Sequence, residues 1–234
     1  MKIHTEYQQG TVEWLEARAG KITASEMDRL VTPLGKVKTG EGPKSYLMEK
    51  LSEKWAGAAL PSANTFMMEQ GNILEEFARP AFELETGLAI KQVGLIETDD
   101  GRCACSPDGI VEGKDIGLEI KSPGMPNHIR YLLDNKLPDD YVLQVQSCLW
   151  VTGFSQWMFT SFRRGMPPLI LTIEPDQKIQ WAIGLAVEEF VHRMDEAWTK
   201  LCEINSGPPP PRQKFVPLPG KPQFTWEMTS EMPS

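Results

Sequence analysis

The chain has 234 residues, a formal net charge of −8 and 41% apolar residues. This composition predicts a globular protein with a substantial core and excludes one that coats nucleic acid by bulk positive charge, although it leaves a local basic cleft open. No run approaches the ~18 apolar residues of a membrane helix and the opening segment lacks a signal-peptide stretch, so we expect a soluble, cytoplasmic protein without membrane contact.

Helical signals dominate the first sixty residues, and a loop rich in Gly and Lys interrupts them at about 31–43. The loop lacks the GxxxxGK[ST] pattern, which excludes a Walker-type nucleotide site. Two interpretations stay open, an exposed surface loop and a Lys-lined DNA contact. Residues 65–86 are predicted to be helical, with a break or kink near Pro80 and an end at Gly87.

Strands and helices alternate over the rest of the chain. Residues 88–97, 102–111 and 116–121 read as strands of a central sheet, residues 127–153 as helical, and residues 157–162 and 169–174 as strands. Residues 176–204 are predicted to form a long amphipathic helix, with apolar positions at Trp181, Leu185, Val187, Phe190, Met194 and Trp198. This order predicts an α/β (α+β) fold.

We expect a single domain over residues 1–206 and an extended tail over residues 207–234. The tail holds 8 of the 19 prolines, so it forms neither a helix nor a central strand. Its aromatic residues Phe215, Phe224 and Trp226 either anchor on a neighbouring subunit or partner, or belong to a tail that packs on its own domain or is disordered.

Asp108 and the GLEIK segment bring together side chains suited to binding a metal. Alternation along a strand places Leu118 and Ile120 on one face and Glu119 and Lys121 on the other. Since Asp108 precedes a Gly-containing turn that leads into this strand, Asp108, Glu119 and Lys121 can converge at one edge of a hairpin. Two hard oxygen ligands beside a cation suit Mg²⁺ or Mn²⁺. The alternative is an exposed Glu119–Lys121 ion pair worth under ~1 kcal/mol.

The surrounding segments carry a family resemblance. SPDG followed by LEIK resembles the PD-(D/E)xK nuclease core, as D-x10-E-x-K. Over residues 8–204 the sequence is similar to the lambda-type exonucleases of the YqaJ-like viral recombinase family, through WLEAR at 14–18, KITASE at 21–26, QGNILE at 70–75, QVQ at 144–146 and LWVT at 149–152. The resemblance implies a central mixed β-sheet flanked by helices, and it does not extend to the tail.

Glu75 is expected on a helix face shared with Ala78 and Phe82, where an unpaired carboxylate would be costly to bury. By resemblance Glu75 is the third carboxylate of the metal site, beside Asp108, Glu119 and the carbonyl of Ile120. The alternative is a helix glutamate that pairs with Arg79.

Further site residues follow from the same resemblance. Arg18 and Ser25 would hold the 5′ phosphate of a DNA end, a role that suits the bidentate guanidinium. Otherwise Ser25 caps a helix and Arg18 is a surface charge. Gln144 would lie beside the scissile phosphate and position the attacking water, with Tyr141 a further candidate one helical turn before it.

Histidines and cysteines provide no competing site. His4, His128 and His192 are scattered without ligand spacing, which favours surface or core positions and gives no support to a triad hydrolase. The four cysteines form no CxxC pair, so we expect reduced thiols at Cys103, Cys105, Cys148 and Cys202.

The resemblance implies a Mg²⁺-dependent 5′-to-3′ exodeoxyribonuclease, with one or two ions per site and Mn²⁺ as a substitute. Lys121, helped by Gln144, would orient or deprotonate the water while the carboxylates hold metal. Such an enzyme degrades one strand of linear duplex DNA to mononucleotides, as a homotrimeric ring that acts beside a single-strand annealing protein in phage or prophage recombination. The alternatives are an endonuclease or nickase of the same superfamily and a non-catalytic protein that binds DNA ends.

Overall fold

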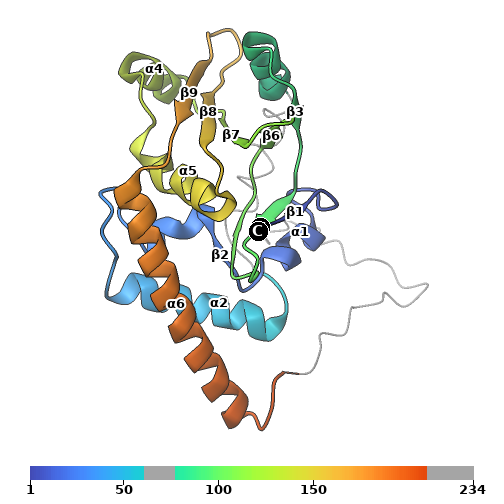
Figure 1. Cartoon of the computed structure of the whole chain (residues 1–234), viewed down its shortest axis with the longest axis vertical. Helices are drawn as coiled ribbons and strands as arrows, with labels where there is room; N and C mark the ends of the chain where they lie inside the picture. Colours follow the sequence, from blue (N-terminus) through green and yellow to red (C-terminus); the bar gives the residue numbers. More distant parts are fainter. Residues whose placement is uncertain (61–76, 210–234) are drawn as a thin grey trace, which may run out of the picture.

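Two mixed sheets carry the strands in the computed structural model, which describes residues 1–60 and 77–209 (Figure 1). The four-stranded sheet has the order β1 (Lys2–His4), β4 (Leu95–Glu97), β5 (Cys103–Cys105), β2 (Ile22–Thr23). The five-stranded sheet has the order β3 (Ile90–Lys91), β6 (Gly109–Val111), β7 (Ile116–Lys121), β8 (Gln156–Ser161), β9 (Leu169–Ile173). Only the β2–β5 and β7–β8 pairs in these sheets are parallel.

The predicted α/β class, with mixed β-structure flanked by helices, is confirmed, but the strands form two sheets and not the one central sheet that was expected. The strands are divided between two sheets because the runs 88–97 and 102–111 each contribute one strand to each sheet. The crossing from β5 to β6 passes through residues 106–108, so Asp108 lies at the junction between the sheets. The short strands β1 and β2, in the region expected to be helical, were not predicted.

Helices cover both sheets. The described helices are α1 (Val12–Arg18), the 3₁₀ helix η1 (Ala24–Arg29), α2 (Glu41–Ala56), a helix over 77–86, α4 (Met125–Asp134), α5 (Asp139–Thr152) and α6 (Gln177–Ile204). Helix α5 contacts strands of both sheets as well as η1 and α6, and so occupies the centre of the fold. Figure 1 shows α6 crossing α2 in the lower half of the molecule.

Strand β7 has two different faces, as its alternation predicts. Leu118 and Ile120 pack with Ala78 and Phe82 in a small cluster beneath the helix over 77–86. The opposite face carries Glu119 and Lys121 toward α5. A larger cluster of buried side chains joins α5 and α6 to the four-stranded sheet and to β8.

Several helix boundaries differ from the sequence predictions. Helix α2 begins at Glu41, inside the expected loop, because Pro43 lies in its first turn where proline is tolerated. The helix over 77–86 passes through Pro80 and ends before Gly87, whereas residues 65–76 lie outside the described residues. The predicted range 127–153 contains two helices, since Pro138 precedes α5.

Helix α6 lies where it was predicted, but its buried face is partly different. Trp181 and Leu185, two of the apolar positions of the predicted amphipathic helix, are 67% and 39% exposed and so lie outside its buried face. Small residues and isoleucines take their place against the core, namely Ile179, Ala182, Ile183 and Ala186. Residues 210–234, which include the tail's three aromatic residues, lie outside the described residues. None of the helices in residues 1–60 and 77–209 is both long and apolar enough to cross a membrane.

Candidate active site

One pocket of about 770 Å³ brings together the two groups of residues that the sequence singled out. Arg18 and Ser25 line it from α1 and η1. The carboxylate and lysine side chains line it from the β5–β6 connection and β7, together with Ile120, and α5 adds Tyr141 and Gln144. Glu75 lies outside the described residues, so its proposed role stays a prediction.

Glu119 is the most buried charged residue of this group, with 2% of its surface exposed. Its Oε1 atom lies 2.6 Å from Lys121 Nζ and accepts a hydrogen bond of 2.5 Å from Gln144 Nε2. Its Oε2 atom is buried and has no hydrogen-bond partner among the described residues. The Glu119–Lys121 pair is therefore part of the pocket and not an exposed ion pair on the surface.

Backbone hydrogen bonds hold Asp108 beside Glu119. Asp108 Oδ2 accepts from the Ile120 amide at 2.5 Å, and the Asp108 amide donates to Leu118 O at 3.0 Å. The following residue must be glycine, because a Cβ at Gly109 would overlap Ile90 of the neighbouring strand β3. The Asp-Gly pair thus turns the chain into β6 while it aims a carboxylate at β7.

This donor set fits a hard divalent cation. Asp108 and Glu119 supply carboxylate oxygens, and the unpartnered buried Oε2 of Glu119 needs a cation or a donor to offset its burial. Within residues 1–60 and 77–209 no group of three or more His, Cys, Asp or Glu side chains has the arrangement of a metal site. A complete coordination shell therefore needs ligands beyond these two carboxylates.

Lys121 is held as an ammonium. Burial lowers the pKa of Lys121, but the negative charges of Glu119 and Asp108 outweigh this effect and raise the pKa above its ordinary value. Its Nζ atom also lies 5.2 Å from the centre of the Tyr141 ring, within the range of a cation–π contact. In this arrangement Lys121 acts as a hydrogen-bond donor.

Arg18 ends α1 and points its guanidinium at η1. Its Nη2 atom donates to Ser25 Oγ at 3.2 Å, and its Cζ atom lies 4.2 Å above the Trp14 ring. Burial lowers the pKa of Arg18, and the nearby carboxylate of Glu26 opposes that shift. Ser25 does not act as a helix cap, because Thr23 occupies the N-cap position of η1 and makes no side-chain capping bond.

Trp14 connects the two halves of the pocket. While Arg18 stacks on its ring, the indole Nε1 donates to Ser106 Oγ at 2.9 Å and to Gly94 O at 3.0 Å. Ser106 is two residues before Asp108, so the position of Arg18 is tied to the segment that carries a candidate metal ligand. Trp14 is 1% exposed, which makes this link rigid.

Other polar residues near the site have structural roles. Gln146, the second glutamine of QVQ, joins α5 to the start of α6 through Glu174 O and the Asp176 amide. His128 is fully buried and pairs with Ser161 Oγ and Pro167 O, which agrees with a core histidine. The four cysteines are free thiols, as expected.

Sequence reasoning missed four charged residues among the described residues that line the pocket, namely Glu26, Glu49, Lys50 and Glu53. The last three belong to α2, whose polar and apolar residues show little segregation between faces, so no pattern marked them as inward-facing. The three-residue spacing between Lys50 and Glu53 was the available signal, because it places both side chains on one side of a helix.

Comparisons with known proteins agree with this fold. Residues 13–155 match the YqaJ-like viral recombinase domain. The crystal structure of an alkaline exonuclease from Laribacter hongkongensis is 27% identical, with a TM-score of 0.72 over 84% of this chain and 98% of that one. A structure of the same exonuclease in complex with dAMP gives the same values.

A second solved structure shares the fold at lower identity. A phage-related exonuclease from Haemophilus somnus 129PT is 17% identical, with a TM-score of 0.60 over 77% of this chain and 96% of that one. No curated protein matches the chain by sequence.

Proposed function

Because the chain belongs to the YqaJ-like viral recombinase domain family, we propose that it is a Mg²⁺-dependent exodeoxyribonuclease that degrades one strand of duplex DNA from the 5′ end. The observation that carries the proposal is the single pocket that holds Asp108, Glu119 and Lys121 together with Arg18 and Ser25. A nuclease centre and an anion-binding pair in one cavity suit a substrate that ends in a phosphate. The likeness to an alkaline exonuclease, one structure of which contains the mononucleotide dAMP, supports the same reaction class.

Asp108 and Glu119 would hold the metal through the carboxylate oxygens that face the pocket, with Glu75 and the Ile120 carbonyl as further ligands. When bound, Mg²⁺, or Mn²⁺ in its place, supplies an activated water and neutralises charge on the leaving oxygen, as one or two ions per site. The chain's own contribution is to fix these oxygens before the substrate arrives, since Asp108 and Glu119 are held by hydrogen bonds to the Ile120 amide and Gln144.

In the hydrolysis, the oxygen of the attacking water forms a bond to phosphorus and the bond between phosphorus and the 3′ oxygen of the terminal nucleotide breaks. The water gives up one proton, and the leaving 3′ oxygen takes one up. Lys121 would donate a hydrogen bond to the phosphoryl oxygens, where negative charge grows in the transition state. Gln144 would orient the attacking water. Arg18 and Ser25 would bind the terminal 5′ phosphate and so set the distance from the end to the scissile bond.

Each cleavage leaves a new 5′ phosphate on the shortened strand, so the product of one cycle presents the end group that the next cycle recognises. We propose that this cycle runs in a homotrimeric ring around the duplex. Its product, a 3′ single strand, would be taken by a single-strand annealing protein in phage-type recombination, in the cytoplasm of a bacterial host.

The decisive experiment is digestion of linear duplex DNA that carries distinguishable labels at its 5′ and 3′ ends, in Mg²⁺ or in EDTA, with a closed circular duplex as control. We expect metal-dependent release of the 5′ label as a mononucleotide and an intact circle. Release of the 3′ label first would contradict the polarity. Cutting of the circle would indicate an endonuclease, and no cutting of either DNA would indicate a protein that only binds ends.

A further inference from the structure

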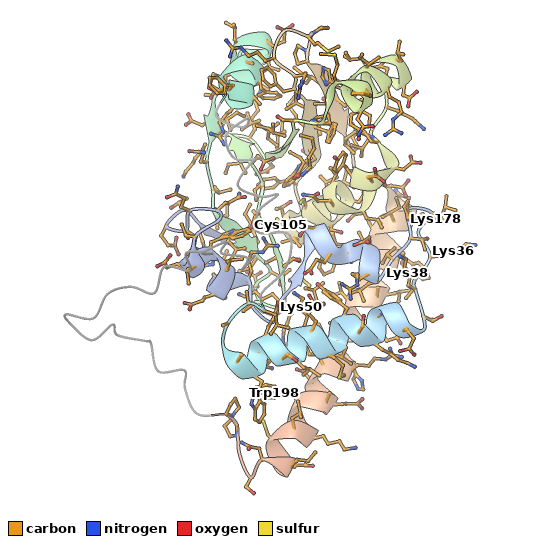
Figure 2. All side chains as sticks on the ribbon, turned by 180° about the vertical axis from the view of Figure 1, so that it is seen from behind. Lys36, Lys38, Lys50, Cys105, Lys178 and Trp198 are labelled. Carbon is orange, nitrogen blue, oxygen red and sulfur yellow. The ribbon has the colours of Figure 1, made fainter. Side chains whose placement is uncertain are left out.

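A buried lysine lies beside the Arg18–Ser25 pair. The side chain of Lys50, from α2, is 4% exposed and lines the pocket. In Figure 2 it lies on the side of α2 that faces Cys105, another residue of the pocket, whereas Lys36, Lys38 and Lys178 lie together at the opposite end of α2. A lysine is rarely buried unless it is paired, so its partners define what it does.

Two carboxylates share the Lys50 ammonium. Its Nζ atom lies 3.0 Å from Glu26 Oε2 and 3.0 Å from Glu53 Oε2. Both carboxylates line the same pocket as Arg18. Burial raises the pKa of Glu26, but Lys50 and the Thr23 hydroxyl outweigh this effect and hold the pKa below its ordinary value, so Glu26 stays ionised.

Neutral groups hold both carboxylates in place. Glu26 Oε2 accepts from Thr23 Oγ1 at 2.7 Å and from the Tyr46 hydroxyl at 3.3 Å. Glu53 Oε2 accepts from the Gly20 amide at 3.0 Å. Thus both negative charges are fixed near the guanidinium by bonds that do not involve Arg18.

Arg18 makes no ion pair within the part of the chain that the structure describes, and its side-chain hydrogen bond goes to the neutral hydroxyl of Ser25. This is unexpected for an arginine with the buried carboxylate of Glu53 and the partly buried carboxylate of Glu26 nearby, because a guanidinium pairs strongly with carboxylates. Lys50 accounts for it, since one ammonium engages Glu26 and Glu53 together.

We infer that Lys50 is a positioning residue for recognition of the 5′ phosphate, which neutralises Glu26 and Glu53 and thereby keeps the Arg18 donors available for the terminal phosphate. The inference rests on the proposed function, since it assigns Arg18 to that phosphate. Without Lys50, one or both carboxylates would compete with the phosphate for Arg18. Their negative charge would also repel the phosphate directly.

The test compares initial rates on two linear duplexes that differ only in a 5′-phosphoryl or 5′-hydroxyl terminus. For Lys50→Met we expect the phosphoryl-to-hydroxyl rate ratio to fall about tenfold or more, because a charge-assisted bond to the phosphate is weakened. Lys50→Arg, which keeps the positive charge, should keep most of the preference. Lys54→Met is the matched control, since Lys54 is on the same helix but stacks on Trp198 outside the pocket lining, and its ratio should equal that of the unmodified protein.

A compensating substitution tests whether Lys50 acts by neutralising Glu26 and Glu53 or in another way. In Lys50→Met/Glu53→Gln one carboxylate is removed with the ammonium, so the ratio should recover at least in part. A normal ratio in Lys50→Met, an equal loss of rate on both duplexes, or the absence of recovery in the double variant would overturn the inference. Absence of recovery would instead indicate direct contact between Lys50 and the phosphate. A ratio of one in the unmodified protein would refute the phosphate pocket of the proposed function itself.

Discussion

The two oxygens of the Glu119 carboxylate have different surroundings. Oε1 accepts from Gln144 and contacts Lys121, whereas Oε2 is buried without a partner among the described residues. A buried carboxylate oxygen without a donor is costly, so the site stores a free-energy penalty that a bound cation would remove. One oxygen thus fixes the side chain, and the other is the one that we propose binds the metal.

Asp108→Asn is expected to abolish Mg²⁺-dependent cleavage, by at least about a hundredfold, while the fold is kept. The asparagine oxygen can still accept from the Ile120 amide, so only the negative charge is lost. The control is the Asp115→Asn variant, because Asp115 is exposed on the same β6–β7 hairpin. This variant should cleave DNA at the normal rate. For each variant, the cleavage rate and the rise in Tm on addition of Mg²⁺ would be measured on the same preparation. Full activity of Asp108→Asn would remove Asp108 from the site.

Lys121→Arg is expected to lower kcat by about tenfold or more, although it preserves the charge. The planar guanidinium is larger and places its donors differently from the compact ammonium that lies 2.6 Å from Glu119 Oε1. Binding to DNA ends in EDTA should stay near normal. Lys114→Arg, an exposed lysine in the hairpin turn, serves as the control. An unchanged kcat in Lys121→Arg would show that only the positive charge at position 121 matters, and not the geometry of the ammonium donor.

At the scale of elements, β7 positions the site because one of its faces packs into the core and the other carries the polar side chains of the pocket. Leu118 and Ile120 pack beneath the helix over 77–86, while Gly117, Glu119 and Lys121 share the opposite face. Gly117 pairs with Trp157 of the parallel strand β8, and a Cβ at position 117 would overlap the Trp157 ring. The strand therefore needs glycine where a bulky neighbour crosses it.

Gly117→Ala should lower the free energy of unfolding by about 1–3 kcal/mol through overpacking against the fully buried Trp157. Gly124→Ala is the matched control, because a Cβ there would have its nearest contact at 4.0 Å and the backbone φ is −60°. Urea denaturation measures both. Equal stability of the two variants would show that β7 can shift away from Trp157 at little cost.

Long, strongly patterned elements were predictable from the sequence, and short ones were not. The helix α6 differs from its prediction by one residue at its start, since twenty-eight residues average out local exceptions such as Trp181. Strands of two or three residues, such as β1 and β2, exist through pairing with distant partners, which no local pattern records. For the same reason the sequence did not show that the run 102–111 crosses between two sheets.

The residues of the candidate site also fall into those that the sequence could predict and those that it could not. Alternation in GLEIK was enough to place Glu119 and Lys121 on one face, and the Asp-Gly turn was enough to bring Asp108 to them. Local spacing could not reveal Lys50, because the role that we infer for it depends on its ion pair with Glu26 of η1, which is 24 positions away in the chain. Local spacing reveals residues on one element, whereas charge balance across elements needs the fold.

At the scale of the whole molecule, a chain of net charge −8 must hold a polyanion. Bulk attraction cannot do this, so we predict that the affinity for a DNA end depends on a few local cations, Arg18 being the one proposed, and weakens strongly with salt. A ring that encloses the duplex would retain DNA by topology after the first cleavage. Association and retention should therefore respond differently to ionic strength.

We predict that the rate of association with DNA ends falls steeply between about 50 and 200 mM salt, while the number of nucleotides removed per binding event, measured with excess unlabelled DNA as a trap, changes much less. Light scattering should give about three times the chain mass of 26.3 kDa. A single-chain mass, or a run length that falls in parallel with association, would contradict the ring, because an open enzyme on DNA is held only by the same screened contacts that first bring it there.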